Sequence, residues 1–93
     1  MKNMIVLAAL LVSSIASAKI ADTTDFTCQE GRRAIIRNGV LPLTVNGSKN
    51  YTRFVADGSW CFGSENAEQA WVPTKDAKHC PIAFVCVDDN SDN

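Results

Sequence analysis

Four cysteines constrain the fold of this 93-residue chain more than any other feature: Cys28, Cys61, Cys80 and Cys86. An even number of cysteines in a short exported chain is typical of two disulfides. A domain of this size buries a smaller fraction of its surface than a typical domain and often needs covalent staples, and each bridge contributes about 2–4 kcal/mol. The sequence therefore predicts one small domain stabilised by two disulfides.

The spacing of the cysteines excludes one of the three possible pairings. Residues Ile82–Val87 look extended, which would place Cys80 and Cys86 roughly 20 Å apart, whereas a disulfide needs Cα atoms within about 7 Å. Two pairings remain: Cys28–Cys86 with Cys61–Cys80, or Cys28–Cys80 with Cys61–Cys86. We favour the first, because it would tie the start of the domain to its last strand.

Residues 1–18 have the pattern of a cleaved signal peptide. Lys2 gives the positive start, Met4 to Val12 is an unbroken apolar run, and Ala16-Ser17-Ala18 fits the signal-peptidase site, which places cleavage before Lys19. The apolar run is about half of the roughly 20 residues that span a bilayer. We expect a periplasmic or secreted protein without stable membrane insertion after cleavage.

The first part of residues 19–93, the expected single domain, has a helix-start pattern. Thr27 and Glu30 fit a capping box, which predicts one short helical turn near Asp25–Glu30. The next segment, Gly31–Arg37, is ambiguous: Ala34, Ile35 and Ile36 could close this helix against Asn38-Gly39, or they could form a strand. Because the two isoleucines are β-branched and an Asn-Gly pair follows, we favour a strand that leads into a hairpin turn.

Regularly spaced turn dipeptides predict antiparallel strands in the rest of the chain. These dipeptides are Asn38-Gly39, Asn46-Gly47 and Asp57-Gly58. The strands expected are Val40–Val45, Tyr51–Ala56, Ser59–Phe62 and Ile82–Val87, with Gly63–Gln69 as a loop. Pro42 favours an edge strand, and the doubly apolar Ile82–Val87 favours a central one. We expect a mainly β fold, a small antiparallel meander curled into a barrel or sandwich, with a flexible polar tail at residues 88–93.

Charge and residue spacing argue against several functional classes. Of nine Lys/Arg and ten Asp/Glu, only Lys2 lies in residues 1–18, so residues 19–93 carry a net charge of −2. Nucleic-acid binders usually present a basic surface, so we do not expect this protein to bind nucleic acid. Cysteine spacings of 33, 19 and 6 lack the close pairs of zinc sites. His79 is the only histidine, and no catalytic set surrounds it. We expect no enzyme activity, metal or cofactor.

Four side chains are candidates for contact with a partner. Tyr51 and Arg53 share one face of a predicted strand, and Trp60 and Trp71 are residue types enriched at binding hot spots. Either Trp could instead fill the core of so small a domain. Asn46 and Asn50 begin N-glycosylation motifs, which would be used only in a eukaryotic host.

Two segments resemble known families. Trp60 followed by Trp71-Val72-Pro73 is similar to the end of bacterial SH3-like domains, with Ala70 in place of the usual Gly. Phe26-Thr27-Cys28-Gln29-Glu30-Gly31 resembles the aromatic-x-Cys-x-x-Gly opening of periplasmic inhibitors of c-type lysozyme, and Gly63–Val72 compares loosely with a later stretch of that family. This resemblance implies a small disulfide-closed β-barrel.

These observations together favour a protein-binding module that acts at the cell envelope or outside the cell. One alternative is a periplasmic inhibitor of a hydrolase such as lysozyme. Another is a secreted phage or host-modulating factor without enzymatic activity. In each case we expect the partner to be another protein.

Overall fold

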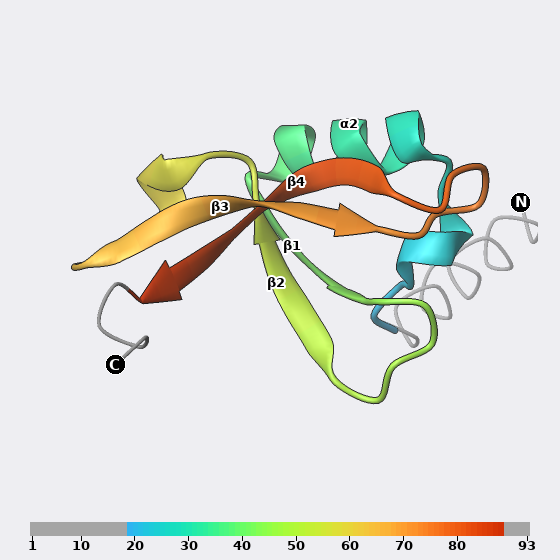
Figure 1. Cartoon of the computed structure of the whole chain (residues 1–93), viewed down its shortest axis with the longest axis horizontal. Helices are drawn as coiled ribbons and strands as arrows, with labels where there is room; N and C mark the ends of the chain where they lie inside the picture. Colours follow the sequence, from blue (N-terminus) through green and yellow to red (C-terminus); the bar gives the residue numbers. More distant parts are fainter. Residues whose placement is uncertain (1–18, 89–93) are drawn as a thin grey trace, which may run out of the picture.

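The computed structural model describes residues 19–88 as a mainly β domain (Figure 1). The predicted signal peptide and residues 89–93 of the predicted tail lie outside the described residues. The elements in chain order are η2 (Thr23–Asp25), α2 (Cys28–Asn38), β1 (Val40–Thr44), β2 (Tyr51–Val55), η3 (Gly58–Trp60), β3 (Glu65–Val72) and β4 (Cys80–Asp88). The predicted fold class, a small antiparallel β domain with two disulfides, is confirmed.

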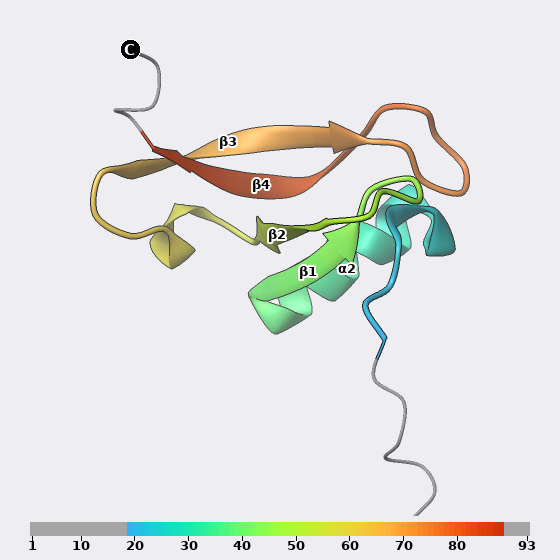
Figure 2. The same cartoon turned by 90° about the horizontal axis from the view of Figure 1, so that it is seen from below.

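The sheet consists of two hairpins placed side by side in the order β1-β2-β4-β3. One registered pair, Val55 with Phe84, joins the hairpins. The sheet is twisted and open, so it does not close into the barrel that we considered (Figures 1 and 2). The two positional predictions are confirmed: β1, which contains Pro42, is an edge strand, and β4 is central.

Helix α2 begins where the capping box predicts. The hydroxyl of Thr27 accepts a hydrogen bond from the Glu30 amide at 3.1 Å, and the Glu30 carboxylate accepts one from the Thr27 amide at 2.9 Å. The prediction of a strand at Gly31–Arg37 is wrong, because the helix continues to Asn38. Gly31 and Ile35 lie four residues apart and form one buried helical stripe, whereas Ile36 is exposed.

The dipeptide Asn38-Gly39 ends this helix instead of forming a hairpin turn. Gly39 is the C-cap with a φ of 83°, and its amide donates to the Ile35 carbonyl at 2.7 Å. A glycine with positive φ is common at helix ends as well as in hairpin turns, so the dipeptide alone did not distinguish the two. Asn46-Gly47 does form the predicted turn between β1 and β2, with φ values of 51° and 81°.

The core lies between α2 and the sheet. Its buried side chains are Ile35, Leu43, Phe54, Val72, Cys80, Ile82 and Ala83. A bulge in β4 places both Ile82 and Ala83 in this core, because Ala70 pairs with Ala83 while Trp71 pairs with Pro81, so that Ile82 has no partner. The helix approaches closely here: a Cβ at Gly31 would lie 2.7 Å from Cδ1 of Ile82.

The disulfides pair Cys28 with Cys80 and Cys61 with Cys86, so the pairing that we favoured is wrong. As predicted, Cys80 and Cys86 lie near opposite ends of one strand and cannot pair with each other. The error in the predicted pairing concerned the position of Cys28. Cys28 is the first residue of α2, and the packing of this helix brings it to the start of β4 and not to its end.

Two segments between β2 and β4 also differ from prediction. Ser59–Phe62, expected as a strand, overlaps the short η3 turn, which Asp57 caps by accepting from the Ser59 amide at 2.8 Å. The polar stretch Gly63–Gln69, expected as a loop, contributes most of β3. A largely exposed edge strand needs backbone pairing on one side and little apolar side-chain burial, so its composition resembles that of a loop.

Asp22 fastens the N-terminal segment to the β1–β2 hairpin. Its carboxylate accepts hydrogen bonds from the Thr44 hydroxyl at 2.6 Å and the Gly47 amide at 2.7 Å, as well as from the amide and hydroxyl of Thr24. Burial acts to raise the pKa of Asp22, but these hydrogen bonds outweigh it and hold the pKa well below its usual range.

Candidate functional site

The structure brings together three of the four predicted contact residues around strand β2 and the η3 turn. Tyr51 and Arg53 alternate along β2 and are both exposed, and Trp60 ends the η3 turn beside them. Phe62, which sequence reasoning missed, belongs to the same cluster and is the most exposed large apolar side chain of the described residues, at 71%. We call Tyr51, Arg53, Trp60 and Phe62 the aromatic–arginine patch.

Arg53 is the centre of this patch. Its guanidinium carbon lies 5.7 Å from the centroid of the Phe62 ring, a cation–π geometry. Its Nη2 donates a hydrogen bond to the Trp60 carbonyl at 3.3 Å, and its Nη1 lies 4.0 Å from Sγ of Cys86. One side chain on β2 therefore orients the loop that carries both exposed aromatic rings.

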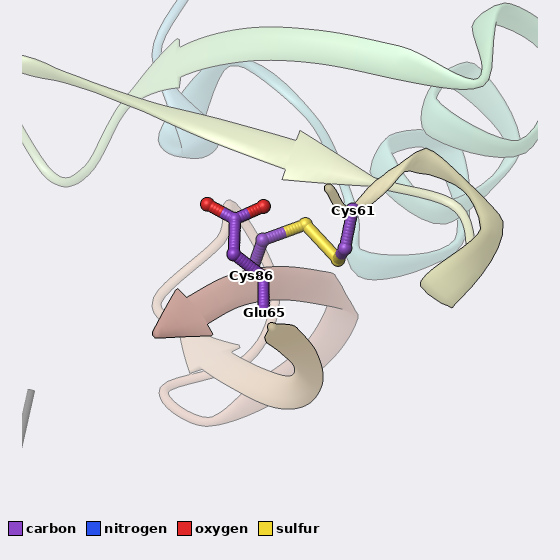
Figure 3. Close-up of side chains that lie close together, drawn as sticks. All are labelled: Cys61, Glu65 and Cys86. Atoms are coloured by element: carbon purple, nitrogen blue, oxygen red, sulfur yellow. A yellow bond between two sulfur atoms is a disulfide. The ribbon is translucent and has the colours of Figure 1, made fainter. Parts of the chain in front are cut away.

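The Cys61–Cys86 disulfide fixes the same loop to the central strand (Figure 3). Glu65 adds a second attachment, since its carboxylate accepts from the Phe62 amide at 2.8 Å while its own amide donates to the Phe62 carbonyl at 3.0 Å. The backbone around Phe62 is thus held by one covalent bond and two hydrogen bonds. Its exposed ring is presented on a constrained segment.

Trp60 packs on one side and is exposed on the other. A Cβ added at Gly39 would overlap its indole ring, so the ring lies directly against the end of α2, yet 42% of the residue remains exposed. The sequence left open whether this residue is in the core or at the surface, and the structure places it at the surface, outside the core cluster. The indole is therefore supported from behind, which limits its rotamers.

Trp71 is exposed but lies away from the patch. It is 60% exposed on β3 and pairs with Pro81, whereas the patch lies beside Cys86. Five residues along β4 separate these positions, roughly 16 Å. Of the two tryptophans in the prediction, only Trp60 joins Tyr51 and Arg53.

Cys61, Glu65 and Cys86 have potential metal-ligating atoms within 4.8 Å of one another (Figure 3). Both sulfurs are bonded to each other, so neither offers a thiolate, and the carboxylate already accepts from the Phe62 amide. In the oxidised protein these three residues are a structural attachment for the loop. The chemistry of the donor set does not fit a metal ion.

The remaining predicted residues lie apart from the patch. His79 is exposed and precedes Cys80, which is buried and bonded to Cys28, so this pair has no free thiol. Asn46 and Asn50 are both exposed in the connection between β1 and β2. Asp57 caps the η3 turn, and hydrogen bonds from the Ser59 hydroxyl and amide lower the pKa of its carboxyl.

Comparisons with protein family models, with curated proteins and with solved structures each find no match to this chain. The segment that resembles the opening of the lysozyme inhibitors forms the start of α2, and the sheet is open where that resemblance implies a closed barrel. Within residues 19–88, no helix is both long enough and apolar enough to cross a membrane.

Proposed function

We propose that this protein is an exported protein-binding module that docks onto its partner through the aromatic–arginine patch. One observation carries the proposal: Arg53 stacks over the exposed ring of Phe62 while bonding to the Trp60 carbonyl. A single side chain thereby gathers residues of the types that dominate protein-binding hot spots. Export is proposed from the signal-like N-terminus and is compatible with two disulfides.

The rigidity of the patch supports a binding role. Ordering side chains and loops at an interface opposes association, so a surface that is already ordered binds more tightly than a mobile one. Here the Cys61–Cys86 bridge, Glu65 and the end of α2 fix the loop that carries Trp60 and Phe62. Large aromatic rings held at the surface in this way contribute contact area at a low entropic cost.

The chemistry of the patch indicates what a partner surface offers. The Arg53 guanidinium donates from Nη2 to the Trp60 carbonyl and from Nη1 to Sγ of Cys86, and it retains further N–H donors for a carboxylate or carbonyl. The Phe62 ring stacks on this cation, and Trp60 and Tyr51 add exposed aromatic area nearby on the η3 turn and on β2. A protein surface with an acidic or carbonyl acceptor inside an apolar rim is the complement.

Capture with matched variants tests the proposal. The oxidised full chain is immobilised and incubated with envelope extract and with culture medium, beside the double variant Arg53→Ala/Phe62→Ala and the control Trp71→Ala. We expect a stoichiometric partner on the wild type and on the control, but not on the double variant. Trp71→Ala is matched because it also removes an exposed aromatic ring from this sheet, outside the patch.

The retained proteins are identified and re-tested as purified proteins, with circular dichroism to verify that each variant is folded. If the partner is a hydrolase such as lysozyme, its activity is measured with and without this protein. Equal capture by the wild type and the folded double variant would refute the proposal, as would equal loss in the Trp71→Ala control. Retention of no protein from either extract would also count against it.

A further inference from the structure

A groove of about 500 Å³ lies along the exposed side of α2, and none of its lining residues belongs to the aromatic–arginine patch. Helix residues Arg33 and Arg37 form one wall, and Lys75, from the β3–β4 connection, contributes the other. Phe26 and Ala34 provide its apolar surface. Its volume is within the range of sites for small molecules.

Three cations line this groove, and none of them has a partner among residues 19–88. Arg33 and Arg37 are four residues apart, so they project from the same side of the helix. Within residues 19–88, the side chains of Arg33, Arg37 and Lys75 take part in no hydrogen bond or ion pair. All three are exposed, and their donors are available to a ligand.

The two carboxylates beside the groove are directed to the backbone. Asp25 accepts from the Asp22 amide at 2.9 Å, and Glu30 accepts from the Thr27 amide at 2.9 Å, each as part of a capping box. Neither pairs with an arginine or lysine of the groove. The lining therefore has an excess of one positive charge, and its cationic donors remain unused.

The walls of the groove are fixed relative to each other. The Lys75 amide donates to the Phe26 carbonyl at 2.8 Å, and the Cys28 amide donates to the Asp76 carboxylate at 2.9 Å. The Cys28–Cys80 disulfide joins the start of the helix to the start of β4 immediately after this connection. The cations thus project from a rigid frame, which reduces the entropy lost on binding.

We propose that this groove binds a small organic oxyanion, a phosphate or sulfate group carried on an apolar or ring-shaped stem. Arginine guanidinium groups match the oxygens of such anions in bidentate geometry, and lysine adds a mobile point charge. Phe26 and Ala34 contact the stem. This site is additional to the protein-binding patch and does not depend on it.

Backbone NMR of the oxidised, ¹⁵N-labelled full chain tests the proposal, with phenyl phosphate as the probe. We expect saturable shifts of amides in α2 and at Lys75, with a dissociation constant in the millimolar range or below. Inorganic phosphate should bind more weakly because it lacks the ring, and phenol should give no saturable shifts at these amides. Phenyl sulfate is the second arm: binding of both esters, or of one, identifies which oxyanion the site accepts.

Variants separate a specific site from general charge attraction. Arg33→Gln/Arg37→Gln should weaken phenyl phosphate binding by about tenfold or more, since hydrogen bonds to charged groups are lost. Lys49→Gln, which removes one positive charge outside the groove, should change it less than about twofold. Absence of saturable shifts up to roughly 20 mM of either ester would overturn the proposal. So would equal weakening by Lys49→Gln, or equal binding of phenol.

Discussion

Replacing Gly31 with Ala tests the close packing of α2 on the bulged strand β4. The new Cβ would lie 2.7 Å from Cδ1 and 3.2 Å from Cγ1 of Ile82, and 3.6 Å from Cβ of Phe26. Ile82 is 2% exposed and belongs to the core beneath α2, so its side chain must shift to admit the new methyl group. Such overpacking costs about 1–3 kcal/mol.

A second effect of Gly31→Ala acts in the opposite direction. Alanine is a better helix former than glycine by about 0.5–1 kcal/mol. We therefore expect a net loss of about 1 kcal/mol in the free energy of unfolding, which lowers the melting temperature by roughly 4–8 °C in a domain of this size. Thermal and chemical unfolding of the oxidised protein, followed by circular dichroism, measure both quantities.

The variant Ile82→Val completes the test, because it removes the Cδ1 that would be closest to the new methyl group. By itself it should cost about 0.5–1.5 kcal/mol. In the Ile82→Val background, Gly31→Ala should become neutral or stabilising, which gives a favourable coupling of about 1–2 kcal/mol between the two positions. The four proteins form a double-mutant cycle. If the two changes in unfolding free energy were additive, or if Gly31→Ala stabilised the wild type, the packing that we describe would be refuted.

Two other positions give predictions that unfolding measurements check. Gly39→Ala should cost about 2 kcal/mol or more, because it combines a φ of 83° with an overlap with Trp60, whereas the control Gly47→Ala, with a φ of 81° and open space around it, should cost about 1 kcal/mol. Equal losses would contradict the Trp60 contact. Because its hydrogen bonds lower the folded-state pKa of Asp22, this residue stabilises the fold above its unfolded pKa of about 4, and the contribution is lost as the pH falls through the folded value. Asp22→Asn should therefore weaken the dependence of stability on pH below about 4. The same loss of stability with falling pH in the variant and the wild type would contradict this.

Local signals in the sequence predicted the parts of the fold that local chemistry determines. The Thr27–Glu30 capping box, the Asn46-Gly47 turn and the edge position of Pro42 each act through neighbouring backbone groups, and each is present. The central position of β4 followed from side chains that are apolar on both faces. These features needed no knowledge of how the chain packs.

The errors concern segments whose structure depends on tertiary packing. Ile35 and Ile36 favour a strand by propensity, but burial of Gly31 and Ile35 against the sheet stabilises a helix there. Residues 65–69 look like a loop because an exposed edge strand buries few side chains. The disulfide pairing was mispredicted for the same reason, since it depends on where the packing of α2 places Cys28.

The candidate site was partly predictable. The alternation of Tyr51 and Arg53 was visible in the sequence, and the structure places Trp60 with them. Phe62 was missed because its segment was expected as a strand, and the arginine contact that marks it comes from a residue nine positions away. The only local hint was that Phe62 directly follows a cysteine expected to form a bridge.

Each of the two disulfides anchors one candidate binding surface. Cys61–Cys86 holds the loop of the aromatic–arginine patch. Cys28–Cys80 holds the start of α2, the helix that lines the groove with Arg33 and Arg37. The alternative pairing would detach Phe62 from the end of β4, where Arg53 contacts it. Both proposals therefore rest on this connectivity.

Disulfide mapping of the oxidised protein by mass spectrometry is the most direct test of this account. Digestion with trypsin and chymotrypsin separates all four cysteines, because chymotrypsin cleaves after Phe84, between Cys80 and Cys86. The structure predicts that the Cys28 peptide remains linked to the Cys80 peptide, and the Cys61 peptide to the Cys86 peptide. Linkage of Cys28 to Cys86 and of Cys61 to Cys80 would contradict the account.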